Sequence, residues 1–299
     1  MAVYTISDLE KLSGVKAHTI RVWEKRYGLI QPRRTPANVR YYEDEHLRKL
    51  LNVTLLKKQG LRISKIADLS EEDILCRVAA ASDLSAPFAS QPDALTLAML
   101  DLDEFLFDRI LRRNTEQHGF ERTVIEVIYP FLDRLGLLWV TDGITTVHHR
   151  FVSRLIRRKL MAAIDGCPPP PRHRRDLRRF LLFLPPGEEQ ELLLLFIEFL
   201  LRNRSFATLN LGSDIDLIDL GDARRFYRPT HVLSLLSDTH ADRPATDFVW
   251  ELTNVFPEAQ LLLSGYQVVS QGLTTTPRCR ILTGLQDTIA YLDACGQEN

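Results

Sequence analysis

The sequence has no long uninterrupted apolar run, which argues against a membrane span. Its most apolar stretch, residues 192–201, contains Glu198, whereas a transmembrane helix needs about 20 predominantly apolar residues. The first residues lack the basic start and apolar core that signal peptides have. We therefore expect a cytoplasmic protein that has no membrane partner.

Cysteine is also scarce, with 4 in 299 residues, and no two cysteines have the spacing of a Cys-x-x-Cys pair. Zinc sites usually need such pairs, and disulfide-rich domains need a denser framework. We therefore predict free thiols and no metal site. Because no Ser/His/Asp set, paired carboxylate motif or Gly-rich phosphate loop is recognisable, we do not expect an enzyme.

Charge is distributed unevenly along the chain, although the net charge is only −1. Residues 1–70 contain 14 Lys and Arg against 7 Asp and Glu, which leaves 24 basic and 32 acidic residues in the remainder. A basic segment attached to an acidic body indicates that the amino-terminal part alone contacts a polyanion.

Two segments interrupt the apolar patterns and suggest three domains. Residues 81–94 are small, polar and proline-containing, as linkers are, and residues 166–172 contain four consecutive prolines. The predicted domains are 1–75, 90–165 and 175–299.

The middle domain is predicted to be a helical bundle. Apolar residues recur at helical spacing through most of it, and the pattern includes Phe105 and Val147. Several such helices with short connections form a bundle.

The last domain changes to short apolar runs, as buried strands do. These runs are 180–184, 207–212, 231–236, 260–265 and 279–283, and helical stretches at 188–202, 244–256 and 285–294 separate them. Buried strands that alternate with helices predict an α/β doubly wound, flavodoxin-like sheet. The whole chain is therefore expected to be multidomain: an all-α winged helix-turn-helix with a short wing, a helical bundle and this α/β domain.

The amino-terminal domain begins with a clear helix start. Thr5 followed by Asp8 forms a capping pattern, Gly14 permits a tight turn, and a second helix is expected from Lys16 to Arg26.

The second helix has two distinct faces. Ile20, Trp23 and Tyr27 share the face that we expect to pack into the core. The opposite stripe consists of His18, Arg21, Val22 and Lys25. A helix with one anchored face and one free basic face can enter a DNA major groove.

A basic, turn-rich segment follows at residues 31–42 and is predicted to form two short strands with cations at the tip. Helices are expected at about 43–59 and 62–69. Such a ribbon beside a recognition helix would contact the phosphate backbone.

Residues 1–70 closely resemble the MerR family. The segments that carry the resemblance are Thr5–Leu9, His18–Leu29, Pro32-Arg33, Arg40–Tyr42 and Leu47–Gly60. The resemblance implies a transcription regulator that binds double-stranded DNA as a homodimer or higher homo-oligomer. It implies DNA-binding roles for Lys16, His18, Thr19, Arg21, Arg33, Arg34, Arg40 and Tyr41.

Residues 90–299 resemble, with fewer matching positions, the cobalamin-binding half of light-responsive MerR repressors of carotenoid synthesis. The positions that correspond to that ligand pocket are Trp139, His149, Gln190, Ser264 and Gly265. In that family a histidine binds cobalt where this chain has Gln190, and a glycine stands where this chain has Leu193. Because a carboxamide is a poor transition-metal ligand, we expect no cobalamin.

Three functions remain open from the sequence. The first is a sequence-specific DNA-binding regulator whose body serves oligomerisation, through the bundle or the sheet domain, and possible sensing of a signal other than cobalamin. The second is a cobalamin-dependent sensing repressor. The third is a protein-interaction adaptor whose DNA-binding head is incidental.

Overall fold

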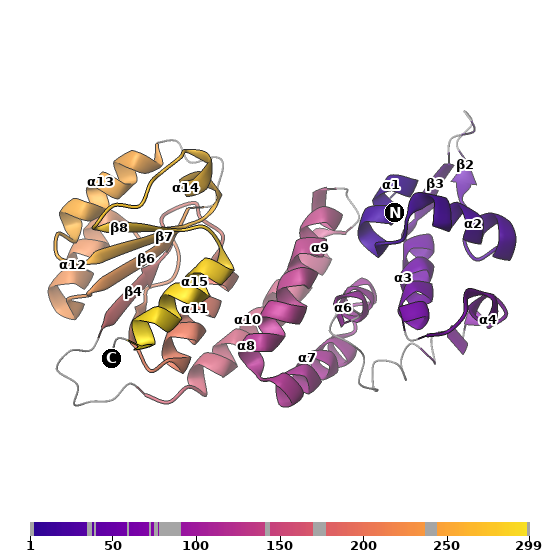
Figure 1. Ribbon diagram of the computed structural model, residues 1–299, viewed down its shortest axis with the longest axis horizontal. Helices are drawn as coiled ribbons and strands as arrows, with labels where there is room; N and C mark the ends of the chain where they lie inside the picture. The colour runs from indigo at the N-terminus through magenta and orange to yellow at the C-terminus, as the bar shows by residue number, and fades with distance from the viewer. Residues whose placement is uncertain are drawn as a thin grey trace. The chain divides into compact units, whose positions relative to one another are not determined.

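The computed structural model describes residues 3–34, 38, 40–58, 60–71, 73–74, 77, 91–140, 144–169, 178–236 and 244–297. The chain divides into two compact units, Met1–Leu155 and Ile156–Asn299. The first unit is largely helical, whereas the second contains a five-stranded sheet (Figure 1). Within the described part, no helix combines the length and the apolar composition that crossing a bilayer requires.

The amino-terminal head combines short helices with a small antiparallel sheet. Its elements are β1 (Val3–Tyr4), α1 (Ile6–Ser13), α2 (Ala17–Tyr27), β2 (Arg33–Arg34), β3 (Arg40–Glu43), α3 (Asp44–Lys58) and α4 (Ile63–Ala67). The sheet has the order β1-β3-β2. The two predicted wing strands are present as β2 and β3, and β1 adds a strand that the sequence analysis did not foresee.

The rest of the first unit is a helical bundle, as predicted. Its elements are α6 (Gln91–Leu100), α7 (Glu104–His118), α8 (Phe120–Thr123), the π-helical segment η2 (Val124–Ile128), α9 (Tyr129–Val140) and the first half of α10 (Thr146–Asp165), whose residues from Ile156 on belong to the second unit. The π-helical segment precedes Pro130, which has no N–H to donate and whose ring crowds the carbonyl of residue 126. Pro130 thus explains the local change in helix winding.

One expectation about the bundle was wrong. Residues 91–94 belong to α6 rather than to a linker, and all ten residues of α6 are buried. Pro92 is compatible with this helix because it lies in the first turn, where its missing N–H has no intrahelical partner. Phe105 and Val147 are 74% and 60% exposed, because each is the second residue of its helix and extends beyond the packed turns.

The second unit is the doubly wound α/β domain that the sequence predicted. Its strands are β4 (Arg179–Phe183), β5 (Ala207–Asn210), β6 (His231–Leu235), β7 (Gln260–Ser264) and β8 (Cys279–Leu282). All are parallel, in the order β5-β4-β6-β7-β8. This is the flavodoxin-like order, in which ligands usually bind beyond the carboxyl ends of the strands.

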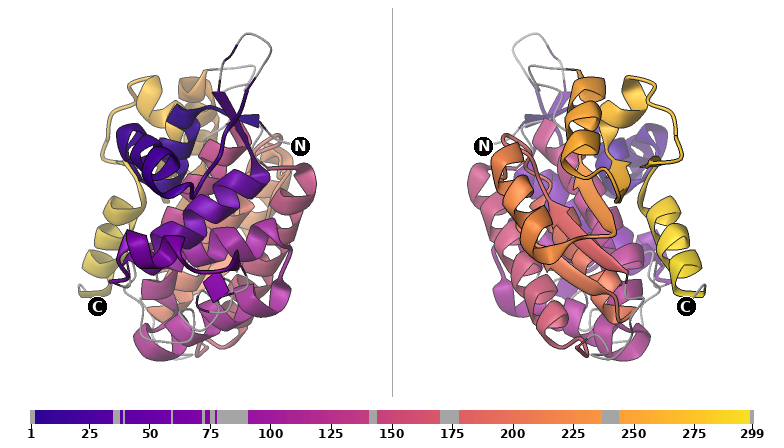
Figure 2. Two further views of the ribbon diagram at one scale, coloured as in Figure 1. Left: turned by 90° about the vertical axis from the view of Figure 1, so that its right-hand side faces the viewer. Right: turned by 90° about the vertical axis from the view of Figure 1, so that its left-hand side faces the viewer.

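Helices cover both faces of this sheet (Figures 1 and 2). The helices are α11 (Glu191–Asn203), α12 (Leu217–Tyr227), α13 (Ala245–Val255), α14 (Tyr266–Ser270) and α15 (Leu285–Gln297). One core cluster joins the strands to Leu220 of α12, Phe248 of α13 and Val268 of α14. Helices α11 and α15 lie on the opposite face (Figure 1). The sequence analysis missed α12 and α14.

A buried carboxylate links the head to the bundle within the first unit. Asp93 of α6 is fully buried, and its Oδ2 atom lies 2.7 Å from Nζ of Lys58, the last residue of α3. Its other oxygen pairs with Arg134 of α9. A more exposed pair, Arg48–Asp101 at 3.1 Å, also joins α3 to the end of α6. Head and bundle therefore share a charged contact whose carboxylate is fully buried and whose cations are partly exposed.

Replacing Asp93 by Asn should lower the free energy of unfolding by about 3 kcal/mol, because two partly buried cations would lose their counter-charge. The matched change Asp101→Asn affects an exposed pair and should cost less than about 1 kcal/mol. Urea unfolding followed by circular dichroism measures both. Equal losses of unfolding free energy in the two variants would show that the burial of Asp93 does not make its ion pairs more stabilising than an exposed pair.

Candidate nucleic-acid interface

The helix-turn-helix is fixed by local hydrogen bonds at the start and end of α1. The Thr5 hydroxyl accepts from the N–H of Asp8 at 3.2 Å, and the Asp8 carboxylate accepts from the N–H of Thr5 at 2.8 Å. Gly14 ends the helix with φ of 69°, a left-handed conformation that suits glycine. The predicted cap and turn are thus confirmed.

The inner face of α2 is anchored in the head. Ile20 and Trp23 are buried, and the ammonium group of Lys57 lies 5.4 Å from the Trp23 ring. Tyr27 is only half-buried, and the Arg26 guanidinium lies 5.5 Å from its ring. The core role predicted for Trp23 is confirmed, whereas Tyr27 lies at the edge.

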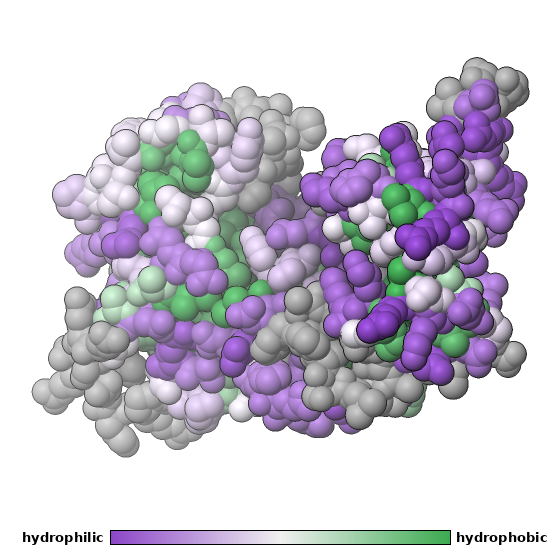
Figure 3. All heavy atoms as spheres, turned by 45° about the vertical axis from the view of Figure 1, so that its right-hand side comes forward, coloured by the Kyte–Doolittle hydropathy of each residue, from purple (hydrophilic) through white to green (hydrophobic). Residues whose placement is uncertain are grey.

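The outer face of α2 is open, as the sequence predicted. His18, Arg21, Val22 and Lys25 are all exposed. Hydrophilic residues cover most of the head surface visible in Figure 3. Two cations and an imidazole therefore project from one side of a short helix whose other side is fixed.

The amino end of α2 is held by Glu10 of α1. One Glu10 oxygen accepts from the N–H of Ala17 and the other from Nζ of Lys16, both at 3.0 Å. These two hydrogen bonds lower the pKa of the Glu10 carboxyl, the backbone bond contributing most. Lys16 therefore sits at the first turn of α2, with 73% of its side chain exposed. Thr19 lies beside it, with its hydroxyl 3.3 Å from Nε2 of His18.

Two cations of the wing, Arg33 and Arg34, form the strand β2. Arg33 pairs with Glu43, its Nε atom 3.0 Å from Oε2, and more loosely with Glu45 at 3.7 Å. Arg34 donates to the side-chain oxygen of Asn38 at 2.6 Å. Both arginines remain exposed, so these contacts orient the side chains without covering them.

Arg40 of β3 ties the wing to α2. Its Nε atom donates to Glu24 at 3.4 Å, and 43% of its side chain is exposed. Tyr41 is half-buried next to it, and Tyr42 is fully buried beneath the wing. Burial, followed by the nearby Glu24 charge, raises the pKa of Tyr42. A cation of the wing is therefore positioned by an acid of the exposed helix.

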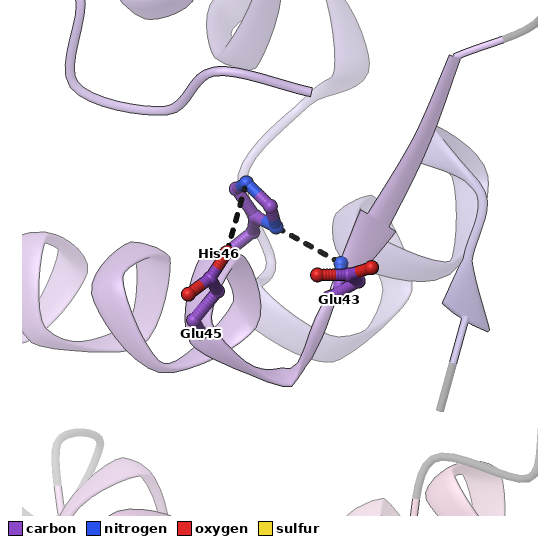
Figure 4. Close-up of side chains that lie close together, drawn as sticks. All are labelled: Glu43, Glu45 and His46. Atoms are coloured by element: carbon purple, nitrogen blue, oxygen red, sulfur yellow. Dashed lines mark hydrogen bonds and ion pairs between the residues drawn. The ribbon is translucent and has the colours of Figure 1, made fainter. Parts of the chain in front are cut away.

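Glu43, Glu45 and His46 gather at the base of the wing (Figure 4), with candidate ligand atoms within 4.8 Å of one another. These groups already have partners: Arg33 pairs with both carboxylates, and Nδ1 of His46 accepts from the backbone N–H of Glu43 at 3.0 Å. The cluster therefore positions Arg33 at the base of the wing.

The residues expected around a ligand pocket lie in both units. Gln190, Ser264 and Gly265 follow the carboxyl ends of β4 and β7, at one edge of the sheet. Gln190 is exposed at the start of α11 and makes no side-chain cap bond. The Ser264 hydroxyl is already satisfied, because it donates to the carbonyl of Leu282 at 2.8 Å.

The remaining pocket candidates belong to the first unit. His149 is exposed on α10. Trp139 falls within α9, but its side chain lies outside the described residues.

The donor set at this edge of the sheet does not fit a cobalt ligand. The neighbour of Gln190, Glu191, pairs with Arg157 of α10. Among the described residues of the second unit, the sole histidine is His231, which lies at the opposite, amino end of β6. It stacks on Phe180 with ring centroids 4.5 Å apart, and burial lowers its pKa to about 4.

A helix-turn-helix with an exposed basic helix, a cationic wing and an attached α-helical and α/β body defines a DNA-binding regulator. Residues 4–73 match the model of the MerR HTH family regulatory proteins. The chain is 31% identical over 263 residues to the HTH-type transcriptional repressor CarH of Myxococcus xanthus, covering 84% of each chain. It therefore belongs to the MerR family of DNA-binding regulators.

Two further similarities are more limited. The HTH-type transcriptional regulator CueR of Bacillus subtilis is 38% identical over 68 residues, which is 23% of this chain and 47% of CueR. A cobalamin-binding protein of known structure from Desulfitobacterium hafniense aligns with 71% of this chain and 98% of its own, at 12% identity and a TM-score of 0.32. The first likeness concerns the head, and the second is too weak to support an argument.

The half-buried imidazole of His231 predicts a pH-dependent stability. Its folded pKa of about 4 lies below the unfolded value of about 6.5, so the unfolded chain binds the extra proton between these values. The contribution of neutral His231 to the free energy of unfolding is fully present above pH 6.5 and is lost as the pH falls toward 4. We expect about 2 kcal/mol less unfolding free energy at pH 5 than at pH 7 from this group. His231→Phe, which keeps the stacking, should reduce that difference; an unchanged pH profile would contradict the assignment.

Proposed function

We propose that this regulator is a homo-oligomeric transcriptional repressor that recognises an inverted-repeat operator, while its body assembles the oligomer and senses a signal other than cobalamin. The observation that carries the proposal is the open basic stripe of α2 beside the cationic wing. The name of the M. xanthus relative supports repression. Operators of this kind consist of two half-sites because a symmetric dimer presents two recognition helices.

In this proposal α2 enters the major groove. Lys16, His18 and Thr19 lie at its first turn and face the base edges, where sequence is read. Arg21 and Arg40 hold phosphates on either side, which fixes the register of the protein on the duplex. Arg33, Arg34 and Tyr41 extend the contact along the backbone from the wing.

Acidic side chains orient the arginines of the wing before DNA binds. Glu24 and Glu43 hold Arg40 and Arg33 in place in the free protein. Phosphate oxygens can take additional guanidinium donors, since each arginine offers five N–H groups. The side chains thus lose less conformational freedom on binding than untethered arginines would.

Changing Arg21 and Arg40 together to Ala should weaken operator binding and reduce the slope of log affinity against log salt by about 2, because two phosphate contacts are lost. Arg112→Ala, an exposed arginine of the bundle, is the matched control and should leave both quantities unchanged. Fluorescence anisotropy with labelled operator DNA at several salt concentrations measures them. Wild-type affinity in the double variant would refute the proposed interface.

A cobalamin-dependent repressor is the second candidate, since the identity to CarH extends over the body as well as the head. The residues at the sheet edge disfavour it: Gln190 replaces an imidazole, and Leu193 is a half-buried side chain where the related family has glycine. Such a cofactor would supply light- or ligand-dependent cobalt chemistry. We infer instead that the body works without it.

Incubation of the purified protein with adenosylcobalamin in the dark should yield a colourless protein after gel filtration. Gln190→His combined with Leu193→Gly restores both family residues and should raise cobalamin affinity, which provides the matched comparison. A red wild-type complex that survives gel filtration would establish the cobalamin-dependent alternative.

A further inference from the structure

The outer surface of the α12–α13 layer carries large apolar side chains that the described residues of the second unit leave exposed. Ile218 and Phe226 of α12 are 79% and 75% exposed, and Trp250 of α13 is 69% exposed. Helices α12 and α13 pack side by side on one face of the sheet (Figure 2, right). Exposed aromatic residues of this kind are typical of interaction surfaces.

The apolar residues lie opposite the buried side of each helix. At 100° per residue, Ile218 and Asp222 point away from Leu220, which packs into the core. Trp250 points away from the buried Leu252 in the same manner. These side chains therefore lie on the outward-facing side of the two helices and not at the edge of the hydrophobic core.

The charges of α12 are separated along its length. Asp219 and Asp222 occupy the first half, whereas Arg224 and Arg225 occupy the last turn. This order also suits the helix dipole, so charge alone would not indicate a partner. Within the described residues, none of these four side chains forms an ion pair with its own chain. The Arg225 guanidinium instead lies 4.9 Å from the Phe226 ring.

A second copy of the same helix, rotated by a two-fold axis, complements this pattern. When two α12 helices run antiparallel, the acidic half of each faces the arginine half of the other. In the register that sets Asp222 of one copy opposite Arg225 of the other, Phe226 of each helix lies against the exposed Gly221 of the other. A two-fold interface must be self-complementary, and a helix with acids first and arginines last meets that condition.

The bundle supplies a further reason to look for the partner here. Helix α6 is buried along its whole length and paired through Asp93, so it offers no surface to a second copy. It has no free face for a coiled coil.

We propose that the outward face of α12 and α13, centred on Ile218, Phe226 and Trp250, joins two copies of this chain through antiparallel α12 helices. This inference rests on the proposed oligomeric repressor and names the surface that assembles it. Trp250 on each copy would cover the side of the α12 pair and exclude water from the charged contacts.

Charge reversal tests the pairing in the full-length protein. Arg225→Glu and Asp222→Arg should each raise the dimer dissociation constant by at least about tenfold, because like charges face each other at two symmetric places. The double variant Asp222→Arg/Arg225→Glu should return to within about threefold of wild type, because the complementary order is restored in reverse. Sedimentation velocity at about 0.1 M salt measures the constants.

Two controls make the outcome decisive. Arg278→Glu changes an exposed arginine away from this face and should leave assembly unchanged, whereas Phe226→Asp should disrupt it without relying on charge pairs. Circular dichroism verifies that each variant is folded. A monomeric wild-type protein, or dimers that tolerate every change at α12, would overturn the proposed interface.

Binding to a DNA duplex with a single half-site separates this proposal from the function on which it rests. The interface variants should bind that duplex with wild-type affinity, since their heads are unchanged. If all proteins, including wild type, fail to bind any operator half-site while the dissociation constants respond as expected, the repressor proposal fails and the interface stands.

Discussion

The structure of the first unit depends on one buried carboxylate. Asp93 lies at the start of the fully buried helix α6, and removing it from water is unfavourable unless cations compensate. Lys58 supplies one from the end of α3, and Arg134 supplies the other from α9. Helix α3, which follows the wing, is thereby connected to α6 and α9 of the bundle. A displacement of α6 or α9 would therefore also displace α3 in the head.

The head uses its own charges in a similar way. Glu10, Glu24 and Glu43 each hold a cation that is assigned to the DNA surface. These acids reduce the positive potential of the free head, but they also place each cation where a phosphate can meet it. Such an arrangement favours correct register over non-specific attraction, because an arginine held in one direction gains less from a randomly placed phosphate.

Periodicity and capping residues were sufficient to predict the main elements. The Thr5–Asp8 cap, the two faces of α2 and the five strands of the sheet follow from local chemistry that the sequence displays directly. Helix α12 escaped prediction because its exposed Ile218 and Phe226 blur the contrast between its faces, and Leu220 is its one fully buried residue. Long-range pairs such as Lys58 with Asp93 leave no local pattern.

At the strand ends of the α/β domain, Gln190 stands where the resembling family has a histidine, within a complete doubly wound fold. Sheet order and bundle depend on many apolar contacts, so they tolerate individual substitutions, whereas binding of a metal-centred cofactor depends on one or two donors. Gln190 supplies no imidazole, and the strand β4 before it and the helix α11 after it are both formed. A fold of this kind can therefore persist in a regulator that uses no metal-centred cofactor. In such a body, the surfaces between subunits rather than the strand ends would carry the regulatory contacts.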